Sequence, residues 1–409
     1  MSRNYPKFTV TDKAANSIRR GHVWVYAEEI VDVSGNPENG GIVDVFSRKG
    51  SWLGAGFLSE HSKIRVRLLS RNTNDTFDRA FWERRIRYAI DYRRAVMGAD
   101  FSACRLIFGE ADGFPGLTAD LFNDVVVTEV LSYGTDKIKN MLYSLLVEEL
   151  ARGGVNVRAV YERSDSPIRE KEGLPAFCGY AEVGGLTKIP PEDDGRLVIT
   201  ENGIRYEINY ITGQKTGFFL DQKYNRVAVA RIAKGRHVLD CFTHTGAFAL
   251  NAAAAGAAAV TAVDISDDAI ALARKNAELN GLSDKIDFVR ADVFEYLTEL
   301  SKSRGAYDLI ILDPPAFTKS NSTVKNALRG YREINRLAMK ILPRGGFLAT
   351  CSCSHFMTDA LFREAIAGAA SDAAVSLREV EGRRQSPDHP ILWGVPETEY
   401  LKFYIFQVV

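Results

Sequence analysis

The sequence predicts an α/β protein whose C-terminal half forms a doubly wound, mostly parallel sheet. From about residue 197 onward, short apolar runs alternate with helix-forming stretches, which is the pattern of strands joined by crossover helices. Acidic residues or cysteines follow several of these runs, and such sheets bind ligands outside the carboxyl ends of their strands. We expect three domains: a small β-rich domain over residues 1–72, an α+β domain over 73–190 and the doubly wound domain over 191–409.

The composition is that of an ordinary globular protein, with 46% hydrophobic and 25% charged residues among 409. No apolar run approaches the roughly 20 residues that cross a bilayer, and the N-terminus lacks the apolar segment of a signal peptide. We therefore expect a cytoplasmic protein without a membrane partner. The five cysteines include no CxxC pair, so neither a disulfide framework nor a metal site is expected. Basic and acidic residues number 52 each, which leaves any nucleic-acid contact to local patches.

Two basic patches stand out in the first hundred residues. Residues 63–69 alternate basic and apolar side chains, so we expect a strand with Lys63, Arg65 and Arg67 on one face. That face suits a phosphate backbone, and an ordinary solvated strand face is an equal alternative. A basic helix over residues 78–97 offers either a second backbone contact or a charged outer face.

A β-loop-α-β unit at residues 236–264 is the centre of the predicted doubly wound domain. A strand over residues 237–241 leads into a loop of small residues, a helix follows from Ala247, and a second strand ends at Asp264. Such a unit offers a nucleoside-like ligand the backbone N–H groups of its loop and a carboxylate for the ribose hydroxyls. The cofactor-binding residues expected here are Asp240, Phe242, Thr243, Gly246, Asp264 and Ile265.

The loop favours a methyl donor over a dinucleotide. A dinucleotide-binding loop needs three glycines near the pyrophosphate, and this loop has only Gly246. The carboxylate of Asp240 would repel a pyrophosphate and attract the amino group of S-adenosylmethionine. A purely structural turn without a ligand is the alternative. After the next strand, Asp292 is placed to meet the adenine amino group with Val293 against the ring, although such an aspartate is also an ordinary helix N-cap.

Two further strand ends carry groups suited to chemistry on a base. Residues 313–317 read DPPAF, and the two prolines fix an extended path and remove two N–H donors. This leaves the Asp313 carboxylate facing the cleft and predicts a nucleobase pocket, with a plain turn as the alternative. The residues expected to bind the base are Asp313, Pro314, Pro315 and Phe317, and Asp313 is also expected to contact the cofactor.

Residues 350–354, TCSCS, end the following strand. Carbon 5 of cytosine is too weak a nucleophile to attack a methyl group unaided, and a thiolate that adds to carbon 6 activates it. Cysteine suits this role when its surroundings lower its pKa. Buried cysteines are commonly inert apolar fillers, but the neighbouring DPPAF segment favours a catalytic role for either Cys351 or Cys353.

Several segments, taken together, are far more specific than any one of them. They are residues 105–117, 213–222, 225–226, the loop after Asp240, 313–317, 352–354 and 387–390. In these segments the chain resembles the RlmI-type family of ribosomal-RNA large-subunit methyltransferases, over nearly its whole length. The resemblance implies an N-terminal PUA domain that binds RNA, a central α+β domain and a C-terminal Rossmann-like methyltransferase domain. It also implies methylation of carbon 5 of a cytosine in 23S ribosomal RNA with S-adenosylmethionine.

The resemblance further implies roles for individual residues. It makes Cys353, in Ser-Cys-Ser, the nucleophile. Cys351 departs from the family pattern, and strand alternation would place both thiols on one face, so the two could exchange roles. Ala316 stands where another branch of RNA cytosine methyltransferases has a cysteine that helps release the product, so the base for the carbon-5 proton is unidentified. The residues expected to lie over the cofactor are Lys215, Thr216, Phe218 and Phe219.

Three other functions remain open at this point. Relatives with a similar Asp-Pro-Pro-x-Phe motif methylate guanine without a cysteine nucleophile. The second is an RNA-binding protein with a degenerate methyltransferase domain, against which the intact Asp264 argues. The third is an NAD-dependent oxidoreductase, against which the missing glycines argue. The sequence identifies neither the target nucleotide nor the oligomeric state, so a homodimer is an open alternative.

Overall fold

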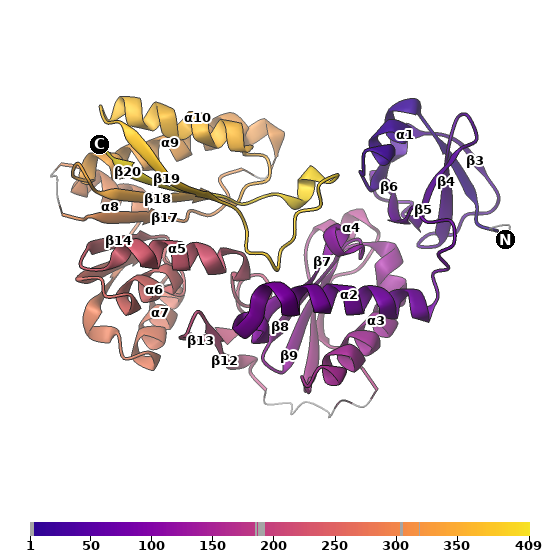
Figure 1. Cartoon of the computed structure of the whole chain (residues 1–409), viewed down its shortest axis with the longest axis horizontal. Coiled ribbons are helices and arrows are strands. Elements are labelled where there is room, and N and C mark those ends of the chain that lie inside the picture. The colour runs from indigo at the N-terminus through magenta and orange to yellow at the C-terminus, as the bar shows by residue number, and fades with distance from the viewer. Residues whose placement is uncertain (1–3, 185, 187–192, 303–305, 319) are drawn as a thin grey trace. The chain divides into compact units, whose positions relative to one another are not determined.

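The computed structural model describes residues 4–184, 186, 193–302, 306–318 and 320–409, which form two compact units (Figure 1). The first unit comprises Met1–Ile199, Ile208–Leu220 and Pro387–Thr398, and the second comprises Thr200–Glu207, Asp221–Ser386 and Glu399–Val409. Three segments expected in the C-terminal domain thus belong to the first unit, namely 193–199, 208–220 and 387–398. The division into three domains stays a prediction.

The N-terminal part of the first unit is a six-stranded sheet in the order β2-β6-β5-β4-β1-β3. Its apolar residues, among them Val25, Val45 and Val66, pack with Ile18 of helix α1 into one buried cluster. The strand expected over residues 63–69 is confirmed as β6 (Ile64–Ser70). The other elements are β1 (Lys7–Val10), α1 (Asp12–Arg19), β2 (Trp24–Tyr26), β3 (Ile30–Ser34), β4 (Ile42–Ser47) and β5 (Trp52–Leu58).

The rest of the first unit is built on a five-stranded sheet in the order β11-β10-β9-β8-β7. The expected basic helix is confirmed as α2 (Arg79–Met97), which Asp78 caps by accepting a hydrogen bond from the Phe81 N–H. Not all of its arginines face outward, because Arg93 is completely buried and forms a two-pronged ion pair with Asp112. The other elements are β7 (Ala103–Phe108), β8 (Leu117–Phe122), β9 (Val125–Val130), α3 (Tyr133–Arg152), β10 (Ala159–Ser164), α4 (Ile168–Lys171) and β11 (Phe177–Tyr180).

The second unit contains a seven-stranded sheet in the order β16-β15-β14-β17-β18-β20-β19, which confirms the predicted doubly wound, Rossmann-like fold. The first five strands in this order are parallel, and β20 and β19 add an antiparallel edge that the sequence analysis did not predict. The strands are β14 (His237–Cys241), β15 (Ala259–Asp264), β16 (Ile286–Arg290), β17 (Leu309–Leu312), β18 (Phe347–Ser352), β19 (Leu377–Arg383) and β20 (Lys402–Val408).

Helices cover both faces of this sheet, with α9 and α10 on one side and α5 and α6 on the other (Figure 1). They are α5 (Lys223–Ala233), α6 (Ala247–Ala254), α7 (Asp267–Leu279), α8 (Val293–Leu300), α9 (Val324–Ile341) and α10 (Asp359–Asp372). A two-stranded sheet of β12 (Arg196–Glu201) and β13 (Ile204–Asn209) has parts in both units.

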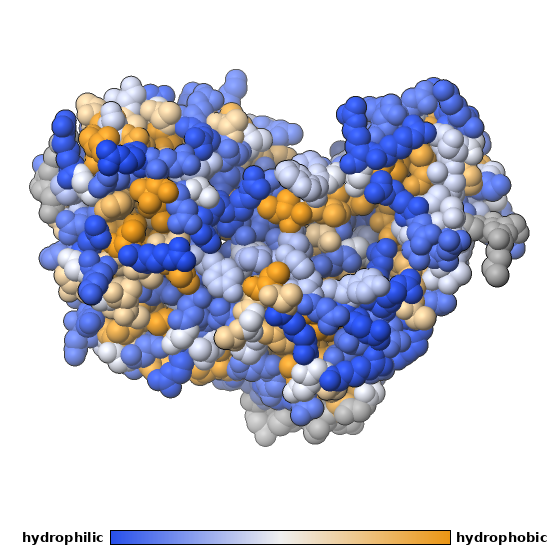
Figure 2. Space-filling model, viewed as in Figure 1, coloured by the Kyte–Doolittle hydropathy of each residue, from blue (hydrophilic) through white to orange (hydrophobic). Residues whose placement is uncertain are grey.

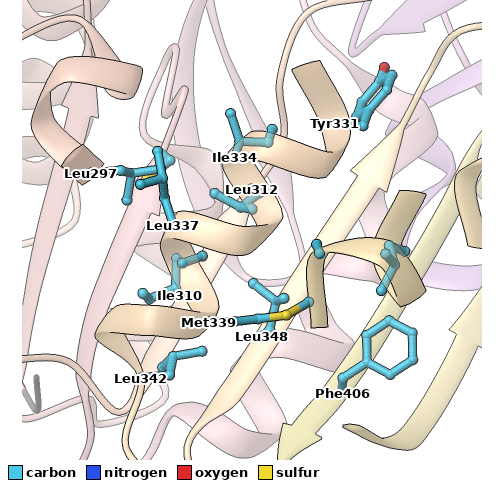
Figure 3. Close-up of a cluster of buried hydrophobic side chains, with 14 of the residues drawn as sticks. Leu297, Ile310, Leu312, Tyr331, Ile334, Leu337, Met339, Leu342, Leu348 and Phe406 are labelled. Carbon is cyan, nitrogen blue, oxygen red and sulfur yellow. The ribbon is translucent and has the colours of Figure 1, made fainter. Parts of the chain in front are cut away.

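A core cluster under α9 fixes the strands that carry the site (Figure 3). Apolar residues recur on α9 at the spacing of one helical face, and Ile334 and Leu337 are buried against Ile310 of β17 and Leu348 of β18. Because these side chains have little room to move, the carboxyl ends of the two strands are held rigidly side by side.

Hydrophilic side chains cover much of the face shown in Figure 2, with smaller apolar groups between them. Among the described helices, none is long and apolar enough to cross a bilayer.

Candidate active site

The groups singled out in the sequence lie along one edge of the second unit's sheet. Strands β14, β15, β17 and β18 run parallel, so their carboxyl ends meet there. Cys241 stands opposite Val263 and Leu312 in the neighbouring strands, and Leu312 stands opposite Thr350. The expected convergence of Asp240, Asp264 and Asp313 with the cysteine segment is therefore confirmed.

The loop after β14 has an unusual backbone. Phe242, His244 and Gly246 all have positive φ, at 62°, 48° and 81°. At Gly246 a β-carbon would come within 3.1 Å of the Ala273 side chain, so glycine is required for both its conformation and its size. The loop thus packs tightly between strand and helix and turns its backbone sharply, as a loop that approaches a ligand must.

Asp240 acts inside this loop. Its Oδ2 accepts hydrogen bonds from the Thr243 hydroxyl at 2.6 Å and from the Ala249 N–H at 3.0 Å. The side chain is completely buried, which raises the pKa of its carboxyl to about 7. Its Oδ1 has no hydrogen-bond partner among the described residues. One oxygen of Asp240 thus holds the loop, and the contact of its carboxylate with the cofactor's amino group stays a prediction.

Asp264 has the environment expected of a ribose-binding residue. It lies half-buried at the end of β15, where Oδ2 accepts from the His244 N–H at 2.9 Å and Oδ1 from the Ser266 N–H at 3.0 Å. A carboxylate can accept about four hydrogen bonds, so two of its lone pairs remain for ribose hydroxyls. The adjacent Ile265 is 61% exposed, an apolar side chain suited to the face of a purine. These features fit the nucleoside part of S-adenosylmethionine.

Asp292 and Val293 serve the protein's own packing. Asp292 caps α8, because its Oδ1 accepts from the backbone N–H groups of Phe294 at 2.8 Å and Glu295 at 3.1 Å. Val293 is 3% exposed and belongs to the core cluster. The structure thus favours the N-cap alternative for Asp292, and the contact of Val293 with the adenine ring stays a prediction.

A buried polar cluster joins Asp313 to Cys351. The Cys351 thiol donates to Oδ1 of Asp313 at 2.8 Å, and the side-chain amide of Gln222 donates to the same oxygen at 3.1 Å. Asn225 holds this amide in place by donating to Oε1 of Gln222 at 2.6 Å. Burial raises the pKa of the Asp313 carboxyl, and burial together with the Asp313 charge raises the pKa of the Cys351 thiol well above its usual range.

Cys351 and Cys353 occupy different environments. Strand β18 ends at Ser352, so the alternation expected to place both thiols on one face does not extend to Cys353. Cys351 is completely buried, whereas Cys353 is partly exposed. The flanking residues are fixed, because the Ser352 hydroxyl donates to the Tyr331 hydroxyl at 2.9 Å and the Ser354 hydroxyl to the Thr318 carbonyl at 2.7 Å. Of the two thiols, Cys353 is the accessible one.

The proposed base pocket is partly occupied by internal packing. Pro314 is buried and Pro315 exposed. The half-buried ring of Phe317 packs against Tyr331 with a centroid distance of 4.6 Å and against Phe294 at 6.0 Å. Phe317 therefore forms part of the pocket's supporting wall, and its stacking on a base stays a prediction.

The four residues expected to lie over the cofactor belong to the first unit. Thr216 and Phe218 are buried there, and the Thr216 hydroxyl donates to Asp120 at 2.5 Å. Lys215 is exposed and places its ammonium 4.7 Å from the ring centre of Phe219. Their role at the cofactor stays a prediction.

The predicted basic face of β6 is smaller than expected. Lys63 is exposed and Arg65, which donates to the Glu60 carbonyl, is half-buried. Arg67 is buried, and its guanidinium lies 2.6 Å from a carboxylate oxygen of Glu172. The period-two pattern placed Arg67 on the correct side of the strand, but that side is covered at Arg67, so its predicted exposure was wrong.

Two residues near the thiols were not singled out in the sequence. Gln222 appeared only as the last residue of a segment that resembles the family, and Lys402 begins β20, a strand that was not expected. The apolar run after Lys402 is the signal that could have revealed this strand.

Comparison with known proteins agrees with this geometry. The chain matches the model of an S-adenosylmethionine-dependent methyltransferase family over residues 189–403 and that of a PUA-like domain over residues 8–71. A protein from Streptococcus mutans described as a SAM-dependent methyltransferase has the same fold, with a TM-score of 0.81 and 24% identity over 98% of this chain and all of that chain.

Curated relatives match over almost the entire length. Ribosomal RNA large subunit methyltransferase I from Pseudoalteromonas atlantica is 40% identical over 395 residues, which cover 96% of this chain and 97% of that protein. The protein of the same name from Klebsiella pneumoniae is 37% identical over 407 residues, 99% of each chain. The chain therefore belongs to the ribosomal RNA large subunit methyltransferase I family and is an S-adenosylmethionine-dependent methyltransferase.

Proposed function

We propose that this enzyme methylates carbon 5 of a cytosine in 23S ribosomal RNA through a covalent bond from Cys353. The observation that carries this proposal is the partly exposed thiol directly after β18, which pairs with β17, the strand that Asp313 follows. Methylation of a guanine nitrogen needs no cysteine nucleophile, so an accessible thiol at this strand end favours the cytosine reaction. The names of the relatives, which refer to large-subunit ribosomal RNA, support the substrate.

In the proposed reaction, the Cys353 thiolate forms a bond to carbon 6 of the cytosine and thereby raises the electron density at carbon 5. Bound S-adenosylmethionine supplies the methyl group that carbon 5 takes up. Loss of the carbon-5 proton then allows the bond between sulfur and carbon 6 to break, which restores the Cys353 thiolate. The accessibility of Cys353 suits this cycle, because the sulfur must reach the base and later release it.

Asp313 would hold the edge of the base. Because burial raises the pKa of this carboxyl, it can keep its proton at a higher pH than an ordinary aspartate does. A protonated carboxyl can donate a hydrogen bond to N3 of cytosine, which draws electrons from the ring and makes carbon 6 easier to attack. Gln222 and Cys351 fix the position of Oδ1 while the base binds.

The first unit would supply contacts with the RNA backbone, and Lys63 and Arg65 are the candidates on β6. A ribosomal RNA substrate also supports the expected cytoplasmic location.

The proposal is tested with a large-subunit ribosomal RNA fragment that contains 5-fluorocytosine in place of cytosine, incubated with the protein and S-adenosylmethionine. Fluorine cannot leave carbon 5 as a proton does, so the covalent complex should accumulate and survive denaturing electrophoresis. We expect the complex with the native protein and with Cys351→Ala, and none with Cys353→Ala. Methyl transfer to unmodified RNA without any trapped complex would contradict the covalent route and favour the guanine alternative.

A further inference from the structure

Lys402 is a buried lysine beside the thiol segment. It is the first residue of β20 and stands opposite Ser352 in the antiparallel pairing with β18. The residue is only 6% exposed, and its ammonium donates hydrogen bonds to the Ser354 carbonyl at 2.6 Å and to the Tyr400 carbonyl at 2.8 Å. The ammonium is therefore tied to the residue that directly follows Cys353.

The positive charge of this lysine lacks an obvious structural partner. Within the described part of the chain, no carboxylate lies within 4.0 Å of its ammonium. Burial lowers the pKa of Lys402 to about 8, and Cys353 is the group whose negative charge most strongly opposes that effect, ahead of Asp359 and Glu399. A buried cation is costly unless an anion compensates it, and a Cys353 thiolate would be that anion.

We propose that Lys402 is a positioning residue whose ammonium stabilises the thiolate form of Cys353. The inference rests on the proposed role of Cys353 as the nucleophile. A thiolate is the reactive form of cysteine, and a neighbouring cation favours it over the neutral thiol. The same charge would assist the last step of the cycle, in which the sulfur leaves carbon 6 as a thiolate.

Four other titratable groups near the thiol segment do not supply this charge. Cys351 and Tyr331 have pKa values raised by burial, so both stay neutral near pH 7. Asp359 accepts a hydrogen bond from the Tyr404 hydroxyl, and Glu399 pairs with Arg384 at 2.7 Å. Among these groups, Lys402 is the cation that the fold directs to the thiol segment.

The alternative is a structural role, in which Lys402 only ties the loop after β18 to β20. The two roles differ in their dependence on pH. Loss of a tether changes the reactivity of Cys353 by a similar factor at every pH. Loss of a stabilising charge raises the pKa of the thiol, so reactivity falls below that pKa and is unchanged above it.

The test is the rate at which iodoacetamide alkylates Cys353 in the full chain between pH 6 and 10. Trypsin releases this thiol in the peptide of residues 345–363, which also contains Cys351, so fragment ions must locate the label. We expect Lys402→Met to alkylate about tenfold more slowly at pH 7 and to match the native rate at pH 10, as a pKa raised by about one unit requires. Lys402→Arg, which keeps the charge, should stay close to the native profile.

The native protein provides a measurement that does not depend on how well a variant folds. Its Cys353 should have an alkylation midpoint below the value of about 8.5 for a free cysteine. A native midpoint at or above that value, or a Lys402→Met profile lowered equally at all pH values, would overturn the inference.

The 5-fluorocytosine complex separates this inference from the proposed function. A trapped complex together with an unshifted alkylation midpoint would support Cys353 as the nucleophile and refute the proposed role of Lys402. A shifted midpoint without a trapped complex would keep the charge interaction and refute the covalent route.

Discussion

Replacement of Asp240 by asparagine should change how the stability of the second unit depends on pH. In the unfolded chain this carboxyl ionises near 3.8, whereas in the folded protein burial raises its pKa to about 7. The stability that the neutral carboxyl contributes is therefore fully present below about pH 4 and is lost as the pH rises through about 7. At about 1.4 kcal/mol per pKa unit, the loss approaches about 4 kcal/mol at pH 8.

Asparagine has nearly the same shape and cannot ionise. Its carbonyl oxygen can still accept from the Thr243 hydroxyl and the Ala249 N–H, so the loop should keep its form. We expect Asp240→Asn to have a similar free energy of unfolding to the native protein near pH 4 and to become the more stable of the two above pH 7.

The assay is urea unfolding between pH 4 and 8 without cofactor. Tryptophan fluorescence is unsuitable, because Trp24, Trp52, Trp82 and Trp393 all lie in the first unit. Far-UV circular dichroism should be combined with hydrogen exchange of the peptide that contains β14, which reports on the second unit directly.

A second variant tests the cause of the shift. The Thr243 hydroxyl favours the ionised form of Asp240, so Thr243→Val should raise the pKa of this carboxyl further. The free energy of unfolding of this variant should therefore keep falling up to a higher pH than that of the native protein, and its total loss should be larger. A difference in stability between the native protein and Asp240→Asn that stays constant from pH 4 to 8 would refute the reasoning, since it would mean that the buried carboxyl ionises like an exposed one.

Three other predictions concern charged pairs. Arg226→Met should lower the free energy of unfolding of the second unit by about 3–5 kcal/mol in urea, because it removes the cation that forms an ion pair with the buried Glu201, and Glu201→Leu in the same chain should recover most of the loss. Arg93→Met should destabilise the first unit by a similar amount, measured by tryptophan fluorescence. Lys63→Ala should make the slope of log RNA affinity against log salt concentration shallower by about one, as the loss of one phosphate contact requires. Arg67→Ala should instead lower the stability of the first unit and leave that slope unchanged.

The fold of the second unit could be predicted where strands are buried on both faces. The runs of β14, β15 and β17 are mostly apolar, and the helices between them leave a parallel sheet as the natural arrangement. β20 pairs antiparallel with β18, which lies about 50 residues earlier in the chain. Because no short turn joins the two strands, the local sequence does not predict this pairing. The transfer of residues 387–398 to the first unit is likewise a long-range event.

Site residues were predictable to the extent that position alone defines them. Asp264 is the last residue of β15 and Asp313 directly follows β17, and the parallel arrangement brings the ends of these strands together. Arg67 shows the limit of this reasoning, because a period of two assigns a side chain to a face without saying what covers that face. Its partner Glu172 lies 105 residues further along the chain, so the burial of this arginine has no local signature.

The two cysteines show why reactivity is harder to predict than position. They lie two residues apart, so strand alternation predicts the same face for both. Because β18 ends at Ser352, this alternation does not extend to Cys353. Cys351 then meets the Asp313 carboxyl in a fully buried place, where burial raises the pKa of its thiol, whereas the segment of Cys353 meets Lys402, whose positive charge favours a thiolate. Neither neighbour lies within 30 residues of the thiols in the sequence. The pairing of β18 with β17 on one side and with β20 on the other thus distinguishes the two thiols, because it places the Asp313 carboxyl against Cys351 and the Lys402 ammonium against the residue that follows Cys353.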